Sequence, residues 1–142
     1  MKPALILLIV LTASLRVLLP PVDASPLCPA LRIPKPVKEA MNRVYPGRVK
    51  WEKEQTHYEA SYVQNGRHTS LLFDDQGRVL ETGVRIRPSA LPVSVRSYFH
   101  WHFPGKKIRE AAEITEASGR RRYEAEINGK DILLNEKGER LN

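Results

Sequence analysis

Four histidines and two glutamate pairs are the side chains of this chain best suited to chemistry. His100 and His102 stand two apart in the sequence HWH, a spacing that suits metal binding only on a strand. On a helix, side chains two apart point about 200° away from each other, so they cannot hold one ion together. His57 and His68 are distant in the sequence, and nothing in the spacing brings them to this segment. We therefore expect no metal site and no cofactor.

The glutamate pairs are Glu52 with Glu54 and Glu124 with Glu126, each in an alternating pattern typical of the solvent face of a strand. A hydrolase needs two carboxyl groups at a defined separation and with unlike pKa values, and alternation establishes neither. The chain also lacks a glycine-rich phosphate loop and a serine nucleophile elbow. We therefore expect no catalytic residues and no enzyme.

Residues 1–24 read as a secretory signal peptide. They combine an early lysine, an apolar run from Ala4 to Leu15 and small residues before a cleavage point after Ala24. That run is about half the roughly 20 residues that span a bilayer, which disfavours a retained anchor. Leu27 before Cys28 disfavours a lipoprotein. We expect a periplasmic or secreted protein with no transmembrane segment after cleavage.

Cys28 is the only cysteine and lies between two prolines in an expected N-terminal tail, residues 25–35. A single thiol cannot form a disulfide within the chain. It can pair with another chain, but we expect it to stay unpaired and without a role.

The chain is basic, with a formal net charge of +7 and a pI near 9.8. An exported protein seldom meets nucleic acid, so we expect no nucleic-acid partner. The positive charge is spread along the chain apart from one run, Arg120–Arg122. A basic surface either keeps the protein soluble or attracts an anionic partner. The second reading gives an alternative function, an envelope-associated structural protein that binds an anionic polymer.

Two stretches of the chain carry the same landmarks in the same order, at offsets between 58 and 65 residues. Small changes in offset are what loop insertions and deletions produce. The sequence therefore predicts two copies of one unit, residues 36–86 and residues 87–142. The paired landmarks are Tyr45–Gly47 with Phe103–Gly105, Tyr58–Ala60 with Tyr123–Ala125, Asn65–Gly66 with Asn128–Gly129, and Gly77 with Gly138.

Each unit begins with a helical pattern and continues with an alternating one. Val37, Ala40 and Met41 share one helical face, and a second helix is expected from Pro92 to about Phe103. Beyond each Pro-Gly the period falls to two, which predicts antiparallel strands with Asn-Gly hairpins. The segment ETGVRIRPSA is expected to join the units. The fold class is α+β, a tandem repeat of a helix plus about four antiparallel strands, with both helices packed on one face of a shared sheet.

The motifs YPG, YEA, NG and LLFDDQG resemble the PepSY-like family, whose fold is related to the two-domain beta-lactamase inhibitory protein. The resemblance covers residues 36–142. The segment ILLNEKGERL departs from it, with Asn135 where the first unit has Asp74. The resemblance implies export, no catalysis and a concave sheet that contacts a protein partner, with inhibition or modulation of a hydrolase as one form of that contact.

The alternating phases also predict which residues face such a partner. In RHTSLLF the buried phase carries Leu71 and Phe73, so Leu72 lies on the opposite phase, and Leu133 does the same in the second unit. An exposed apolar patch is typical of a partner site. A bulge that reverses the phase, or a covering loop, would remove this patch. The predicted binding residues are Glu59, His68, Ser70, Leu72, Glu124, Glu126 and Leu133, with the three glutamates at the rim.

Overall fold

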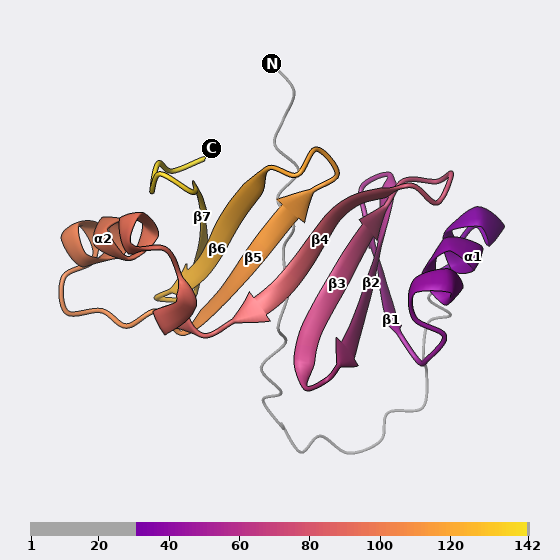
Figure 1. The fold of residues 1–142 in the computed structure, drawn as a ribbon, viewed down its shortest axis with the longest axis horizontal. Helices are drawn as coiled ribbons and strands as arrows, with labels where there is room; N and C mark the ends of the chain where they lie inside the picture. The colour runs from indigo at the N-terminus through magenta and orange to yellow at the C-terminus, as the bar shows by residue number, and fades with distance from the viewer. Residues whose placement is uncertain (1–30, 142) are drawn as a thin grey trace, which may run out of the picture.

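The computed structural model of the chain describes residues 31–141, which form one seven-stranded antiparallel sheet and two α-helices (Figure 1). The α+β class is confirmed. The predicted signal peptide, most of the tail and Cys28 lie outside the described residues. The elements are α1 (Lys35–Val44), β1 (Lys50–Glu54), β2 (His57–Gln64), β3 (Arg67–Phe73), β4 (Val79–Ile86), a 3₁₀ turn (Pro88–Ala90), α2 (Val93–His102), β5 (Glu110–Glu116), β6 (Arg121–Ile127) and β7 (Lys130–Asn135).

The strands follow one another across the sheet in chain order, from β1 to β7. β4 and β5 pair in the middle and join the two halves into one sheet. This corrects the reading of ETGVRIRPSA as a connection, because most of that segment belongs to β4 and only its end forms the 3₁₀ turn. Within residues 31–141, no helix has the length and apolar character needed to cross a membrane.

The two helices lie at opposite ends of the molecule (Figure 1). α1 buries Val37 and Met41 against a cluster that includes Phe73, and α2 buries Val95 and Phe99 against β5 to β7. The strand register places both clusters on one face, which confirms the predicted position of the helices. Each helix has 10 residues, too short to be stable alone, so packing on the sheet stabilises it.

Two glycines hold equivalent turns against the two helices. Gly77 and Gly138 both have φ near +80°. A Cβ atom on Gly77 would lie 2.6 Å from the Pro36 carbonyl oxygen, and one on Gly138 would lie 2.5 Å from that of Ser94. Each turn therefore needs glycine for its backbone conformation and for its close approach to a helix.

The departure at Asn135 keeps the backbone hydrogen bonds of the turn, although the side-chain partner changes from Arg78 beside Asp74 to Glu139 beside Asn135. Asp74 Oδ1 accepts hydrogen bonds from the backbone N–H groups of Gln76 and Arg78, at 3.0 and 2.9 Å. Asn135 Oδ1 accepts two such bonds, both of 3.0 Å, from positions two and four residues further on. Both side chains thus stabilise the same kind of turn.

The second half has three strands, fewer than the predicted four. The Asn-Gly hairpins form as expected, with positive φ at Asn65 and Asn128. β4 is paired on both sides, by β3 and β5. The corresponding segment after Gly138 meets β7 alone and makes one isolated bridge, between Leu134 and Arg140. The internal duplication itself stays a prediction.

Candidate functional site

The candidate site is the sheet face that points away from the helices. Alternate residues of each strand point to it, and one row across the sheet runs through Ser61, Ser70, Gly83, Ile114 and Arg122. β2 and β6 are four strand spacings apart, about 19 Å in a flat sheet. Leu72 on β3 and Leu133 on β7, which are also four strand spacings apart, nevertheless lie in one hydrophobic cluster with Ile114 on this side of the sheet. The sheet therefore curls toward this side, which we call the concave face.

The predicted phase of the two leucines is confirmed, but their predicted exposure is wrong. Leu72 and Leu133 point to the concave face, yet Leu72 is fully buried and Leu133 is 7% exposed. They form a cluster with Ile114, and Leu80 and Leu141 pack against it. A register shift opposite Leu72 brings Leu80 to this cluster without reversing the phase of Leu72. The curl of the sheet gathers these side chains, so the leucines stabilise the face and leave no open apolar patch.

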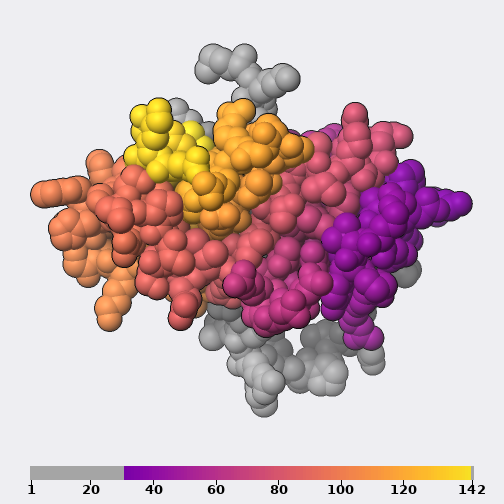
Figure 2. Space-filling model, viewed as in Figure 1, coloured from indigo at the N-terminus to yellow at the C-terminus, as the bar shows by residue number. Residues whose placement is uncertain are grey.

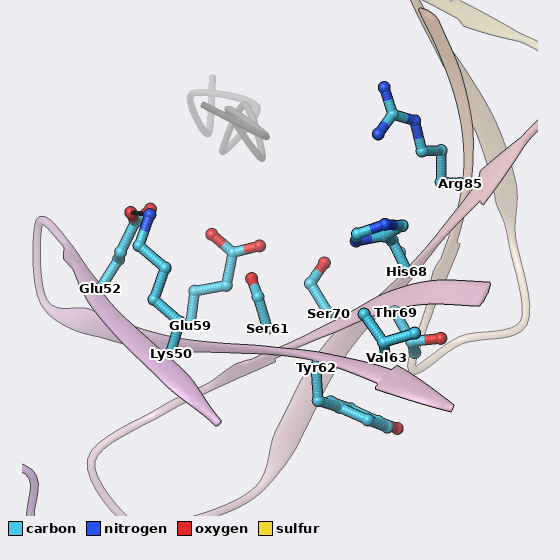
Figure 3. A pocket seen from close by; sticks show the side chains of 11 residues that line it. Lys50, Glu52, Glu59, Ser61, Tyr62, Val63, His68, Thr69, Ser70 and Arg85 are labelled. Atoms are coloured by element: carbon cyan, nitrogen blue, oxygen red, sulfur yellow. Dashed lines mark ion pairs between the residues drawn. The ribbon is translucent and has the colours of Figure 1, made fainter. Parts of the chain in front are cut away.

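A first hollow of about 240 Å³ lies over β1 to β4 (Figure 3). It brings together three of the predicted binding residues, Glu59, His68 and Ser70. Figure 3 shows the side chains of Glu59 and Ser70 pointing into the hollow, while Tyr62 points away from it. Val63 adds an apolar wall and is 48% exposed.

A second, smaller hollow of about 30 Å³ lies over β4 to β7. Two further predicted residues, Glu124 and Glu126, line it beside Asp131. Arg85 borders both hollows. Sequence reasoning missed Arg85 because its segment was taken as a connection. Arg85 lies four residues after Glu81 in β4, so alternation places both side chains on the same face. This alternation is the sequence signal that would have identified Arg85.

Two of the predicted rim glutamates are buried. Glu59 is 2% exposed and Glu124 is 5% exposed, which corrects their placement at the rim of the face. Burial, followed by the charge of Glu54, raises the pKa of Glu59 to about 7. Burial, followed by the charges of Asp131, Glu59 and Glu54, raises the pKa of Glu124 to about 8. We call Glu54, Glu59, Glu124 and Asp131 the carboxylate cluster.

The predicted basic run Arg120–Arg122 is not a free patch. Arg122 is 5% exposed and lies on the concave face, where it pairs with Glu81 and with Glu116, the latter at 3.2 Å. The other two arginines also have acidic partners, at 3.3 Å in Glu116 and 2.7 Å in Glu136. Strand alternation explains this, because Arg122 has the opposite phase from Arg121.

The histidines do not come together. His100 and His102 are exposed on α2, whereas His57 and His68 belong to β2 and β3 on the concave face. Among residues 31–141, no three His, Cys, Asp or Glu side chains are arranged to hold a metal ion. His57 Nδ1 is buried without a hydrogen-bond partner and lies near Glu81, whose pKa is raised by burial.

The sequence matches no known protein-family profile and no curated protein. Solved structures match the fold across 77–79% of this chain. One is from Bacteroides eggerthii, described as a candidate periplasmic protein, with 20% identity, a TM-score of 0.68 and 87% of its chain covered. A DUF2874 family protein from Bacteroides uniformis has 20% identity, a TM-score of 0.66 and 86% covered.

A third solved structure, from Bacteroides fragilis, is described as a BLIP-like protein. It has 20% identity and a TM-score of 0.58, with 79% of this chain and 85% of that chain covered. Predicted export agrees with the periplasmic description of the first neighbour. At these identities the likeness concerns the fold, so the chain has a BLIP-like fold and its membership of the PepSY-like family stays a prediction.

Proposed function

We propose that this protein is an exported, non-catalytic binding module that contacts a protein partner through its concave face. The observation that supports this most is a set of buried polar atoms without hydrogen-bond partners on that face, Ser70 Oγ, Glu81 Oε2 and Glu124 Oε2. A buried polar group left unpaired costs about 1–3 kcal/mol. Such groups need an explanation in a native structure, and a partner that supplies hydrogen bonds is one.

The shape of the face favours a protein over a small substrate. The two hollows share Arg85 and together extend over all seven strands. Among residues 31–141, no histidine or lysine is hydrogen-bonded to the Ser70 hydroxyl to act as its base. We include inhibition or modulation of a hydrolase as one proposed form of this contact, because the sequence resemblance implies it and a BLIP-like protein shares the fold.

A matched pair of tryptophan substitutions tests this function. Ser61→Trp fills the first hollow, whereas Ser97→Trp places the same side chain on the exposed side of α2. Tagged full-length protein is expressed in its exporting cell, and the envelope proteins it retains are compared after both variants are shown to fold by circular dichroism. We expect a partner retained by the wild type and by Ser97→Trp and lost with Ser61→Trp. Equal retention by both variants, or none by the wild type, contradicts the proposal.

A second candidate function has its own observation. The stretch from Arg87 to Arg109 holds five Lys and Arg residues and no Asp or Glu. It forms the end of the molecule away from α1 (Figure 2), and Trp101 within it is 78% exposed. A basic surface with an exposed aromatic side chain suits an anionic polymer. This surface takes the place of Arg120–Arg122 in the alternative function.

Salt dependence separates the two functions. On an immobilised dextran sulfate column, Lys106→Gln/Lys107→Gln should elute at lower salt than the wild type, because exposed charges attract a polyanion and salt screens them. Lys35→Gln/Lys38→Gln on α1 is the matched control, and its elution salt concentration should differ less from that of the wild type. Equal shifts for the two pairs would show that the column reads net charge alone.

A further inference from the structure

We propose that the carboxylate cluster is a receptor for one basic side chain of the partner, arginine in preference to lysine. This inference rests on the proposed function, because it assumes that a protein docks on the concave face. It adds the chemistry of the residue that the partner must present there.

The cluster joins the two halves of the molecule. Glu54 and Glu59 come from β1 and β2, whereas Glu124 and Asp131 come from β6 and β7, at the other end of the sheet. Glu59 stands opposite Leu72 and Glu124 stands opposite Leu133, and the two leucines lie in one cluster, so the packing of the face brings the two glutamates toward each other. In keeping with this, the charges of Asp131, Glu59 and Glu54 each disfavour the ionised form of Glu124. Carboxylates held this close repel one another, and a cation placed among them removes that repulsion.

The charge of the face excludes an anionic partner group. Along the strands, nine carboxylates and three cationic side chains point to the concave side, although the whole chain is basic. The carboxylates are Glu52, Glu54, Glu59, Glu81, Glu110, Glu116, Glu124, Glu126 and Asp131.

The lysine and arginine side chains of the concave face do not form ion pairs with the two buried glutamates, Glu59 and Glu124. Within residues 31–141, neither Glu59 nor Glu124 forms an ion pair with a lysine or an arginine. Arg122 lowers the pKa of Glu124 but does not offset burial and the charges of the neighbouring acids, which raise it. The three strand cations of the face pair with other carboxylates: Lys50 with Glu52 (2.7 Å), Arg85 with Glu110 (2.5 Å), and Arg122 with Glu116 (3.2 Å) and with Glu81.

The atoms without partners are those that a guanidinium group would satisfy. Glu124 Oε2 and Ser70 Oγ are buried and accept no hydrogen bond, and each residue is 5% exposed. Arginine presents five N–H donors in a planar fork, which suits several oxygen acceptors at once. The aliphatic stem of the same side chain can pack on Val63, whose side chain is half exposed in the wall of the first hollow.

The binding should depend on pH, because the cluster must lose protons to meet a cation. The charged groups that face Glu59 are Glu52 and Glu54 from β1 and Glu124 from β6, with the Ser70 hydroxyl from β3. The charged groups that face Glu124 are Asp131 from β7, Glu54 from β1, Glu59 from β2 and Arg122 from its own strand, β6. All but Arg122 and Ser70 are acidic, so raising the pH strengthens attraction for a cation.

The test uses n-propylguanidinium, which reproduces the end of an arginine side chain, and n-propylurea, its neutral counterpart. Each is titrated into the full-length protein while amide resonances are followed by NMR. We expect saturable shifts near Glu59, Ser70 and Glu124 with the cation only, and an affinity at least 10-fold higher at pH 8.5 than at pH 6. Shifts that do not saturate, that spread over all surface carboxylates or that appear with the urea overturn the inference.

Three variants complete the test. Glu59→Gln and Glu124→Gln should each weaken binding of n-propylguanidinium by about 10-fold, whereas Glu39→Gln on the exposed side of α1 should leave it unchanged. The amide spectra show directly whether each variant is folded. An equal loss in all three variants overturns the inference.

The two experiments also separate the inference from the proposed function. If Ser61→Trp abolishes partner capture while n-propylguanidinium does not bind, the inference fails alone. If the cation binds and no partner is retained, the proposed function fails alone.

Discussion

The two faces of the sheet are built from different chemistry. The face under the helices is filled by apolar clusters around Phe73 and Phe99. Of six buried polar or charged residues, five point to the concave face, and the sixth, Asp74, belongs to a turn. They are Glu59, Ser70, Glu81, Arg122 and Glu124.

Burying apolar groups stabilises a fold, whereas burying charged groups costs free energy unless they are paired. The helix-covered face therefore accounts for stability. The concave face keeps groups that folding alone does not need, which is the pattern expected of a functional surface. The comparison predicts that removing a core side chain from the helix-covered face destabilises the protein, whereas removing an unpaired charge from the concave face stabilises it.

The largest effect should come from the helix-covered face. Phe99→Ala removes a ring that is 4% exposed and packed under α2, which should lower the free energy of unfolding by about 4 kcal/mol. Val93→Ala on the same helix is the control, because Val93 is 69% exposed and should change stability by less than about 0.5 kcal/mol. Urea unfolding monitored by circular dichroism measures both. Similar losses for the two variants would contradict the assigned core.

On the concave face, the paired charges should behave differently from the unpaired ones. Arg122→Met leaves Glu81 and Glu116 without their buried cation, which should lower the free energy of unfolding at pH 7 by about 3 kcal/mol. Burial raises the pKa of Glu81 and Arg122 opposes that rise, so loss of Arg122 raises the pKa further and the defect should shrink at pH 5. Arg121→Met is the matched control, and its exposed pair should contribute less than about 1 kcal/mol. A loss independent of pH would argue against the ion pair.

Replacing an unpaired glutamate should stabilise the protein at high pH. The pKa of Glu124 is raised from 4.5 to about 8 in the folded chain, so its contribution to stability is complete below about pH 4.5 and falls as the pH rises through 8. Glu124→Gln cannot ionise. Its free energy of unfolding should therefore exceed that of the wild type by an amount that grows between pH 5 and pH 9, on the order of 2 kcal/mol. A constant difference across this range would contradict the buried state of Glu124.

The smallest effect should come from the turn after β7, which is equivalent to the turn after β3 in the first half. Asn135→Asp/Glu139→Arg gives the second turn the acid and the base found at Asp74 and Arg78 in the first. Glu139 is changed as well because it accepts a hydrogen bond from Asn135 Nδ2 at 2.6 Å and would repel a carboxylate there. The backbone hydrogen bonds accepted by the side chain are the same in both turns. We expect a change in thermal unfolding free energy below about 0.5 kcal/mol. Asn135→Ala removes the acceptor and should cost about 1 kcal/mol. If the two variants lose equally, the turns are not chemically equivalent.

Local signals predicted the local structure well. The helical spacing of Val37, Ala40 and Met41 and the Asn-Gly turns depend on nearby residues only, and the structure places them as expected. The phase of Leu72 also followed from alternation within one strand.

Features that depend on distant strands were not predictable from spacing. The burial of Glu59 and Glu124 arises from the curl of a seven-stranded sheet, which no single strand pattern reports. The sequence of β4 resembled a connection because its central position in the sheet depends on pairing with β5. In the sequence, β5 is separated from β4 by α2. Arg122 was read as part of a basic run because its partner Glu81 is 41 residues away.

The most direct test of this account is the titration of Glu59 and Glu124 in the full-length protein, followed by side-chain ¹³C NMR with and without n-propylguanidinium. Without the cation, we expect midpoints of about 7 and about 8, because the concave face buries both carboxyl groups among other acids. With the cation, both midpoints should fall. Midpoints near 4.5 in the free protein, or values that the cation does not lower, would contradict a concave face that holds buried carboxylates for a basic partner.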